Sequence, residues 1–423
     1  MNKNIAVIIL AAGKSTRMKS EVPKVLHPIC ARPMLGYALD LVGTLKTDKV
    51  IVVLGHKQEE VKKLLKPKTK VVVQQRLIGT ADAVKQAGGL LKNFKGTVLV
   101  LYADNPLLTK DTIKKLFHHH LENNLDATLL TAKVNNPEGY GRVLRDRYSS
   151  MCGIVEEKDA DDFQRDIKEI NTGIACFKAS RLFEALKYIR PNNRKKEYYL
   201  TDTIGIIYKK GGVIDGLKLP DIKEAWGINS RQDLARANRI MQKRINEEFM
   251  KQGITIVDPR STFISYGTKI GKDTTIYPFT VIESDVKIGR RCLVGPFIHL
   301  REGTRLDDDV IVGNFLEVVR SKLADKTEVK HFSYLGDSRI GRSVNIGAGT
   351  VTANFDGRRK NTTIIKDKAF IGSDTILIAP VKIGKHAITG AGSVVVKNKN
   401  VSDGATVVGV PARSLKKVRG KGR

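Results

Sequence analysis

Small residues and cations gather near the start of the chain, where they could bind a phosphate. Residues 5–12 form an apolar run, and Gly13, Lys14 and Arg17 follow it, with Lys24 close behind. Small residues let a backbone approach a ligand closely, and Lys and Arg donate charge-assisted hydrogen bonds to anions. A loop of this kind after the first strand of an α/β sheet predicts a nucleotide site. Its spacing matches neither the G-x-x-x-x-G-K-[ST] loop of ATPases nor the G-x-G-x-x-G loop of dinucleotide-binding enzymes, so we expect neither class.

Asp104 is a second candidate for chemistry. It follows the strand-like run 97–101 and its short extension. A carboxylate at the carboxyl edge of a sheet can hold a divalent cation. Alternatively, Asp104 caps the helix that follows, which is a common role of Asp in β–α turns. The local pattern leaves both roles open.

Three consecutive histidines, His118, His119 and His120, could suggest a metal site. Consecutive residues cannot all face one side of a helix. We therefore interpret these histidines as helix surface.

The elements that must position these residues follow from periodicity. Residues 1–228 alternate apolar runs, such as 50–54 and 71–73, with helical stretches. This alternation predicts a Rossmann-like α/β domain with a mostly parallel sheet covered on both faces. Residues 229–253 have one apolar face and predict an amphipathic linker helix.

From Ile264 onward the apolar period changes to six residues. The aliphatic positions are Ile264, Ile270, Ile276, Ile282, Ile288, Val294, Leu300, Leu306, Val312, Val318, Ile340, Ile346, Ile365, Ile371, Leu377 and Ile383. This period is typical of a left-handed parallel β-helix of hexapeptide repeats, which we predict over residues 254–412. The period breaks at 319–339 and 354–363, where we expect loops. The basic tail 413–423 is predicted to be disordered.

The formal net charge of +30 is high. It could indicate nucleic-acid binding, or a lysine-rich surface that attracts small anions. The cations are scattered, with no aromatic-interleaved basic module and no helix-turn-helix pattern, so we do not expect a nucleic-acid partner.

The four cysteines and the absence of long apolar runs indicate a cellular compartment. Cys30, Cys152, Cys176 and Cys292 lie far apart with no C-x-x-C spacing, which favours free thiols in a reducing cytoplasm. The sequence contains no run of 18 or more apolar residues, so we predict no membrane span. The chain enters its first strand almost at once, so we expect no signal peptide.

The motifs of the first domain resemble a known family. LAAGKSTRM at 10–18 and PKVLHPI at 23–29 are similar to the signature of sugar-1-phosphate nucleotidylyltransferases. The second motif is nearest to the bacterial members that are fused to an acetyltransferase. The resemblance covers essentially all of residues 3–235. It implies a nucleotidyltransferase domain that makes UDP-N-acetylglucosamine and pyrophosphate from UTP and N-acetylglucosamine 1-phosphate, with Mg²⁺ as cofactor.

This resemblance implies roles for individual residues. Asp104 and Asn229 would bind Mg²⁺, which screens the repulsion between the two phosphate groups and holds attack in line. Lys24 would clamp the sugar phosphate or the α-phosphate, and Arg17 the leaving pyrophosphate. The residues implied to contact substrate are Leu10, Ala11, Ala12 and Gly13 in the loop, Gln74, Gly79 and Thr80 near the uracil, and Gly141, Glu156 and Asn171 near the sugar.

The second domain carries HFSYLGD at 331–337 and VNIGAGT at 344–350, which resemble the acetyltransferase site of the same fused enzymes. The resemblance implies acetyl-CoA as cosubstrate and glucosamine 1-phosphate as acceptor. His331 would be the general base, because an imidazole titrates near working pH. The implied acceptor positions are Arg301, Tyr334, Asn345 and Lys360, and the implied acetyl-CoA positions are Asn354, Ser373 and Ala391.

Ser15 of the first loop replaces a glycine of the family pattern, and three positions of the second domain also depart from it. Val319 replaces a phosphate-binding lysine, Phe355 a tyrosine and Gly409 an arginine. Loss of one hydrogen bond to a charged group removes about 1.5–3 kcal/mol, which predicts weaker binding of the acceptor phosphate.

We also expect a homotrimer, because the acetyltransferase residues cannot all converge within one solenoid. The alternatives are a uridylyltransferase whose β-helix serves assembly, a related sugar-1-phosphate nucleotidylyltransferase, and a non-catalytic sugar-nucleotide sensor.

Overall fold

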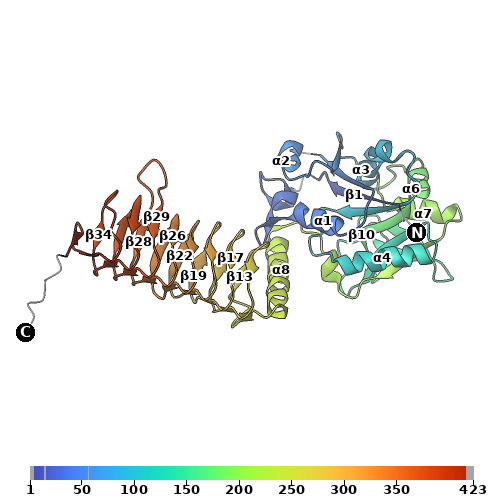
Figure 1. Cartoon of the computed structure of the whole chain (residues 1–423). Coiled ribbons are helices and arrows are strands. Elements are labelled where there is room, and N and C mark those ends of the chain that lie inside the picture. The colour runs from blue at the N-terminus through green and yellow to red at the C-terminus, as the bar shows by residue number, and fades with distance from the viewer. Residues whose placement is uncertain (1–3, 14–15, 56, 416–423) are drawn as a thin grey trace, which may run out of the picture. The chain divides into compact units, whose positions relative to one another are not determined.

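The computed structural model describes residues 4–13, 16–55 and 57–415. Its contacts divide the chain into two compact units, Met1–Ala237 and Asn238–Arg423 (Figure 1). Helix α8 (Arg231–Lys251) contains the division between them. No helix among the described residues is long and apolar enough to cross a membrane.

The first unit is built on one sheet with strand order β11-β7-β10-β6-β1-β4-β5. The strands are β1 (Ile5–Ala11), β4 (Lys49–Leu54), β5 (Lys70–Val73), β6 (Thr97–Tyr102), β7 (Ala127–Lys133), β10 (Glu169–Lys178) and β11 (Ile214–Lys218). In addition, β8 (Arg142–Arg145) pairs with β10 and with β9 (Met151–Val155), and β2 (Pro28–Ile29) and β3 (Arg32–Pro33) form a separate hairpin. Only β10 runs antiparallel to its neighbours on the main path. The predicted mostly parallel sheet is confirmed.

Both faces of this sheet are buried, as a continuous apolar strand requires. Ala6, Ile8 and Leu10 of β1 pack into one core cluster, and Val7 and Ile9 into the other. Helices α3 (Thr80–Gln86), α6 (Ala179–Ala185) and α7 (Asp202–Lys209) cover the first face, and α1 (Met34–Gly43) and α4 (Lys110–Glu122) the second, while α2 (Gln58–Lys62) and α5 (Asp162–Arg165) are short. The carboxyl ends of β1 and β6 are left open for a ligand.

The interpretation of all three α4 histidines as helix surface is wrong for His120. His118 is exposed, but His120 is 2% exposed, and its Nδ1 lies 2.8 Å from the Thr128 hydroxyl of β7. The apolar face of α4 that packs on the sheet includes position 120, which consecutive sequence alone does not reveal. No group of three or more His, Cys, Asp or Glu side chains in the described part of the chain could hold a metal ion.

The second unit is a left-handed parallel β-helix with three faces, so the fold predicted from the six-residue period is confirmed. The first face has β12 (Thr255–Ile256), β15 (Thr275–Ile276), β18 (Leu293–Val294), β21 (Ile311–Val312), β24 (Glu328–Val329), β27 (Asn345–Ile346), β30 (Phe370–Ile371), β33 (Ile388–Thr389), β35 (Thr406–Val408) and β36 (Arg413–Ser414). The second face has β13 (Phe263–Ile264), β16 (Val281–Ile282), β19 (Ile298–Leu300), β22 (Leu316–Val319), β25 (Ser333–Gly336), β28 (Val351–Ala353), β31 (Ile376–Ile378) and β34 (Val394–Val395). The third face has β14 (Lys269–Ile270), β17 (Lys287–Ile288), β20 (Arg305–Leu306), β23 (Lys322–Leu323), β26 (Ser338–Ile340), β29 (Thr363–Ile365) and β32 (Val381–Ile383).

Each coil runs from the first face to the second and then the third. We name the corners between them the first–second, second–third and third–first edges. The aliphatics of the six-residue period stack inward and form one continuous core, in which Ile270 alone is only partly buried. Each inward side chain pairs with its equivalent one coil further on, as Ile282 does with Leu300.

The expected loop at 319–339 is wrong. The coil continues there, with Leu323, Val329 and Leu335 fully buried in the core. Val318 pairs with Leu335, and these two residues are one position closer in the sequence than the paired Leu300 and Val318. Two turns, between Val318 and Leu323 and between Leu335 and Ile340, are each one residue shorter than the period, which shifts it without ejecting chain.

The second break does produce a loop. Chain leaves the helix between β28 and β29, where an isolated bridge joins Phe355 to Lys360 (Figure 1). At the chain's end, Arg413 and Ser414 form β36 against β35, which corrects the expected start of the disordered tail. The rest of that expectation concerns mostly residues 416–423, which lie outside the described residues.

Candidate active sites

A cavity of about 230 Å³ lies at the carboxyl edge of β1 and β6. It brings together nine of the predicted site residues: Leu10, Ala11, Ala12, Gly13, Lys24, Gln74, Gly79, Thr80 and Asp104. Tyr102 and Glu197 also line it. The sequence analysis did not single out Tyr102, although its place at the end of β6, two residues before Asp104, is a signal that could have found it.

Lys24, Asp104 and Asn229 meet at one point of this cavity's wall. Lys24 lies in the 3-10 turn Lys24–Leu26, Asp104 follows β6, and Asn229 precedes α8. The Lys24 ammonium donates to the Asp104 carboxylate and to the Asn229 side-chain oxygen, the latter at 2.9 Å. The side chains of Lys24 and Asp104 are 12% and 19% exposed. The two oxygens therefore converge on a single cation position.

The backbone holds these oxygens in place. The N–H of Ile228 donates to the Asp104 carbonyl oxygen at 2.9 Å, which ties the segment before α8 to the end of β6. Asn229 donates its own N–H to Asp233 and its side-chain N–H to the Gly227 carbonyl oxygen, so its side-chain oxygen faces the cation. Asp104 does not cap α4, because Thr109 is the N-cap and accepts from the Thr112 N–H.

Two convergent oxygens suit a divalent ion. Mg²⁺ in nucleotide sites uses one or two side-chain oxygens and completes its shell with water and substrate phosphates. The residues present therefore fit Mg²⁺. The Lys24 ammonium occupies the shared position in this structure, and a divalent ion bound there would displace it, because two cations repel at that distance.

The segment with Gln74, Gly79 and Thr80 is tightly constrained. Gln74 is 4% exposed and donates to the Gly79 carbonyl oxygen at 3.0 Å and to Asp82 at 2.9 Å. Gly79 has φ of +128°, and a Cβ there would lie 2.3 Å from the Tyr198 carbonyl oxygen. Thr80 accepts from the Leu200 N–H at 2.9 Å. A rigid backbone of this kind can present fixed donors and acceptors to a base.

The three predicted sugar residues also lie together. The Asn171 N–H donates to the Gly141 carbonyl oxygen at 2.8 Å, and a Cβ on Gly141 would lie 3.5 Å from a Glu156 carboxylate oxygen. Glu156 accepts from the Thr201 hydroxyl at 2.9 Å, and burial raises its pKa. Burial also raises the pKa of Tyr102, and Glu156 and Asp104 add to the shift, so Tyr102 lies near both groups.

An acidic neighbour accompanies Glu156. Burial, with Glu156 and Asp159 nearby, raises the pKa of Asp202 to about 6.

Arg17 behaves differently from the other predicted residues. It is exposed in the 3-10 turn Thr16–Met18 and does not line the cavity. Residues 14 and 15 of the same loop lie outside the described residues.

The predicted acetyltransferase residues form two groups. Arg301, Tyr334, Asn354 and Lys360 lie on the second face or at the second–third edge, and His331, Asn345, Ser373 and Ala391 lie on the first face or at the first–second edge. Asn354, predicted with the acetyl-CoA positions, thus lies with the acceptor group. Within one chain, Arg301, Asn354 and Lys360 lie at the second–third edge, away from the first–second edge that carries His331, Ser373 and Ala391.

Contacts within the first group are direct. Asn354 donates to the Asp337 carboxylate and lies 3.5 Å from the Tyr334 hydroxyl. A Cβ on Gly336 would lie 2.6 Å from that hydroxyl, so the glycine permits this packing. Arg301 is held by Glu317 through a 2.7 Å bond.

Comparison with known proteins covers both units. Residues 7–187 match the family of MobA-like NTP transferase domains, and residues 267–297 match the bacterial transferase hexapeptide family of six repeats. The chain is 44% identical to the bifunctional protein GlmU of Shouchella clausii, over 92% of this chain and 93% of that protein. It is 43% identical to the bifunctional protein GlmU of a Geobacillus species (strain WCH70), over 92% of each. The chain belongs to the GlmU family.

The departures expected from the family pattern can now be located in this member of the GlmU family. Val319 is 2% exposed in β22 and pairs with Gly336. Arg320 does not replace a cation at position 319, because its guanidinium binds both oxygens of Asp337 at 2.7 and 2.8 Å. Phe355 is 61% exposed on the loop, and Gly409 follows β35 with φ of +90°.

Proposed function

We propose that this GlmU-family protein transfers a uridylyl group from UTP to N-acetylglucosamine 1-phosphate and acetylates glucosamine 1-phosphate with acetyl-CoA. The observation that carries the first reaction is the convergence of Lys24, Asp104 and Asn229 on one cation position beside a cavity for a nucleotide. A sugar-phosphate oxygen attacks the α-phosphorus of UTP, the bond to the β-phosphate breaks, and pyrophosphate leaves.

The side chains of the first unit have distinct tasks in this reaction. Bound Mg²⁺ supplies charge that stabilises the transferring phosphate. Asp104 and Asn229 hold that ion, and the Lys24 ammonium moves to a phosphate oxygen. The Gln74–Thr80 segment orients the base, while Gly141, Glu156 and Asn171 bind the sugar. Arg17 contacts the pyrophosphate group only if its turn closes over the bound nucleotide.

The second reaction is an acyl transfer in the β-helix. The amine of glucosamine 1-phosphate attacks the thioester carbon, the C–S bond breaks and coenzyme A leaves as the thiol. His331 takes the proton that the amine loses. Arg301, Tyr334, Asn345 and Lys360 bind the acceptor, and Asn354, Ser373 and Ala391 contact acetyl-CoA.

We propose that the site is completed in a homotrimer. The two groups of predicted residues lie at different edges of one chain, so a neighbouring copy can supply the missing group. The first–second edge also carries three stacked phenylalanines, Phe279, Phe297 and Phe315, with ring centroids 4.8 and 5.0 Å apart. They are 45–66% exposed in the single chain, which supports burial against another copy.

A cytoplasmic location agrees with these substrates. The four cysteines, all among the described residues, form no disulfide, which fits a reducing compartment.

One observation favours a narrower second function, in which only the uridylyltransferase is active and the β-helix serves assembly. Val319 places a buried apolar side chain where the family pattern has a phosphate-binding lysine.

The decisive experiment is a pair of assays on the wild type, Asp104→Ala and His331→Ala. Pyrophosphate release with UTP and N-acetylglucosamine 1-phosphate should disappear only in Asp104→Ala. Thiol release from acetyl-CoA with glucosamine 1-phosphate should disappear only in His331→Ala. Pyrophosphate release without thiol release in the wild type would leave the narrower function, and loss of both reactions would favour the non-catalytic sensor.

A further inference from the structure

The third face of the β-helix presents a single row of outward-pointing cations along its stacked strands, which we call the file. Its strands are two or three residues long, and in each one residue points outward beside the inward aliphatic. The outward residues, paired strand to strand, are Lys269, Lys287, Arg305, Lys322, Arg339, Ile364 and Lys382. Six of these seven positions are cationic and none is acidic, so the file is not a random sample of the surface.

This arrangement has an electrostatic cost within the fold. Neighbouring strands lie about 4.8 Å apart, so the file is about 30 Å long, and like charges directly opposite one another destabilise a sheet. Arg305 pairs with Asp285 at 2.8 Å and Lys322 with Asp307 at 3.1 Å. Lys269, Lys287, Arg339 and Lys382 form no ion pair with any described residue. The core is formed by the inward aliphatics and does not require these cations.

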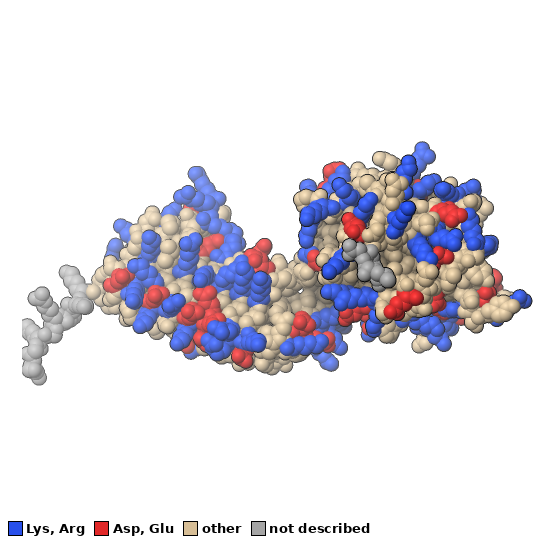
Figure 2. Space-filling view, turned by 45° about the vertical axis from the view of Figure 1, so that its right-hand side comes forward, with Lys and Arg blue, Asp and Glu red and all other residues tan. Residues whose placement is uncertain are grey.

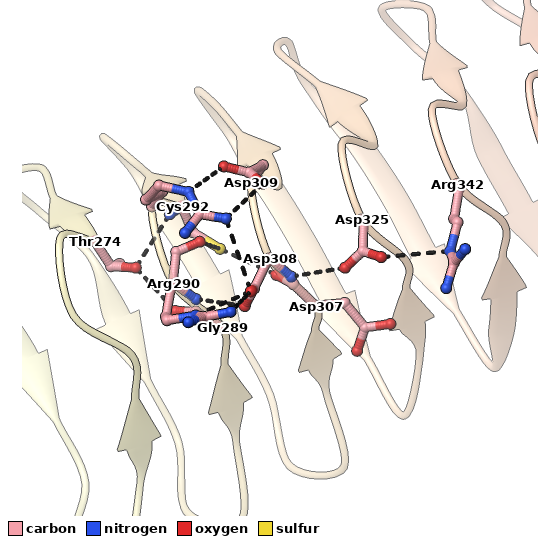
Figure 3. A network of polar contacts seen from close by, with 10 residues as sticks. Thr274, Gly289, Arg290, Cys292, Asp307, Asp308, Asp309, Asp325 and Arg342 are labelled. Carbon is pink, nitrogen blue, oxygen red and sulfur yellow. Dashed lines mark hydrogen bonds and ion pairs between the residues drawn. The ribbon is translucent and has the colours of Figure 1, made fainter.

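Carboxylates border the file on both sides. Asp307, Asp308, Asp309 and Asp325 lie along the third–first edge, and Figure 3 shows them beside the strands. Asp285 and Asp337 lie at the second–third edge. The edge arginines do not extend the file, because Arg290 binds Asp308 and Arg291 binds Asp309, each at 2.7 Å. A broad anionic surface such as a membrane would meet the carboxylates of both edges, whereas a narrow chain that follows the cations would meet only the two that pair with Arg305 and Lys322.

The file offers charge without stacking. No outward residue of the third face is aromatic, and the stacked phenylalanines lie at the first–second edge. Proteins that bind single-stranded nucleic acid combine cations with aromatic platforms. Figure 2 shows Lys and Arg over both units with Asp and Glu between them, so net charge alone does not mark a face. We propose that the third face binds a flexible linear polyanion of the polyphosphate type along the file.

The test uses the full chain and labelled inorganic polyphosphate, with binding measured by anisotropy at several salt concentrations. Six neutralised charges predict a slope of log K against log salt near −4, at about −0.7 for each contact on a single strand. A variant with Lys269, Lys287, Lys322, Arg339 and Lys382 changed to Gln should bind at least about tenfold more weakly, with a slope near −1. A matched control changes Lys92, Lys95, Lys110, Lys114 and Lys115, which are exposed on the first unit, to Gln.

The outcomes separate the file from general charge. The proposal is overturned if the control loses as much affinity as the file variant, or if oligo-dT or vesicles with anionic lipid bind the wild type more tightly than polyphosphate does. Uridylyl transfer should stay near wild type in both variants, and neither should melt at a lower temperature than wild type, because removing like charges from the third face relieves repulsion. Should the fivefold variant fail to fold, Arg339→Gln and Lys382→Gln alone should each reduce the slope by about 0.7, and unchanged slopes would refute the file as the site.

Discussion

At the scale of single residues, Lys24 stands where a divalent ion would bind. Its ammonium is shared between the Asp104 carboxylate and the Asn229 side-chain oxygen. It can therefore neutralise Asp104 in the free protein and move to a phosphate when nucleotide and metal enter together. An ammonium that moves between these two positions would weaken metal binding in the free protein but support turnover once the nucleotide is bound.

We predict that Lys24→Met abolishes uridylyl transfer yet tightens Mn²⁺ binding in the absence of nucleotide. Removing the ammonium leaves the two oxygens free for the ion, whereas the phosphate loses its cation. Mn²⁺ affinity is read by electron paramagnetic resonance and turnover by pyrophosphate release. Asp104→Ala should lose both properties, and the exposed Lys92→Met should lose neither. Near-normal turnover of Lys24→Met would refute the phosphate role, and unchanged Mn²⁺ affinity would refute the competition.

Asp202 gives a pH-dependent prediction. Its pKa is raised from 3.8 to about 6, so the folded protein binds this proton more tightly than the unfolded chain does. The destabilisation caused by ionised Asp202 therefore grows as pH rises from about 4 to about 6 and is constant above that. Asp202→Asn should stabilise the first unit at pH 7.5 by about 1–2 kcal/mol, or roughly 3–6 °C in melting temperature, and by almost nothing near pH 3.5. Calorimetry at both pH values measures this, and an equal gain at both would contradict it.

At the scale of elements, β22 carries the departure that should weaken the proposed acetyltransferase site. Its Val319 is buried and pairs with Gly336, beside the Tyr334 hydroxyl and Asn354. A lysine at this position can pack its stem where the valine lies and extend its ammonium toward the acceptor.

We predict that Val319→Lys lowers KM for glucosamine 1-phosphate more than it changes kcat, because a phosphate contact present throughout the reaction adds uniform binding. Each 1.4 kcal/mol recovered corresponds to about tenfold in KM. Val319→Met controls for size without charge and should give no gain. If neither the wild type nor Val319→Lys releases thiol from acetyl-CoA, the β-helix is a scaffold.

The coils of the β-helix allow core and surface contributions to be compared. Leu335 is fully buried in the stack, whereas Arg291 is half-exposed and pairs with Asp309 at the third–first edge. Leu335→Ala should cost about 2–5 kcal/mol of unfolding free energy, because it leaves a cavity in a close-packed core. Arg291→Ala should cost much less, since exposed ion pairs are screened by solvent. Urea unfolding measures both, and comparable losses would contradict this ranking.

At the scale of the whole molecule, the proposed intersubunit site requires assembly. We predict a trimer by light scattering at micromolar concentration. Phe297→Glu with Phe315→Glu should give monomers, because two charges replace the apolar edge proposed to pack against another copy. Uridylyl transfer should survive in these monomers while acetyl transfer is lost. A monomeric wild type would overturn the intersubunit site.

The sequence by itself determined the fold of both units and the position of the first cavity. A six-residue aliphatic period predicts stacked coils, and an apolar run followed by small residues and cations predicts a phosphate-binding loop at a strand end. These signals are local, because they depend on residues within one turn or one coil. The same locality explains why Lys24 and Asp104 could be chosen as candidates before their contact was known.

Only the tertiary structure decided which distant residues touch. Lys24 and Asn229 are 205 positions apart, and their shared contact depends on where the segment before α8 crosses the end of β6. The burial of His120 depends on how α4 packs against β7, and the continuous coil at 319–339 depends on two turns that are each one residue shorter. The file on the third face likewise appears only when coils are stacked, since its members are 17 to 25 residues apart along the chain. Contacts between positions far apart are set by topology and packing, and no local pattern encodes them.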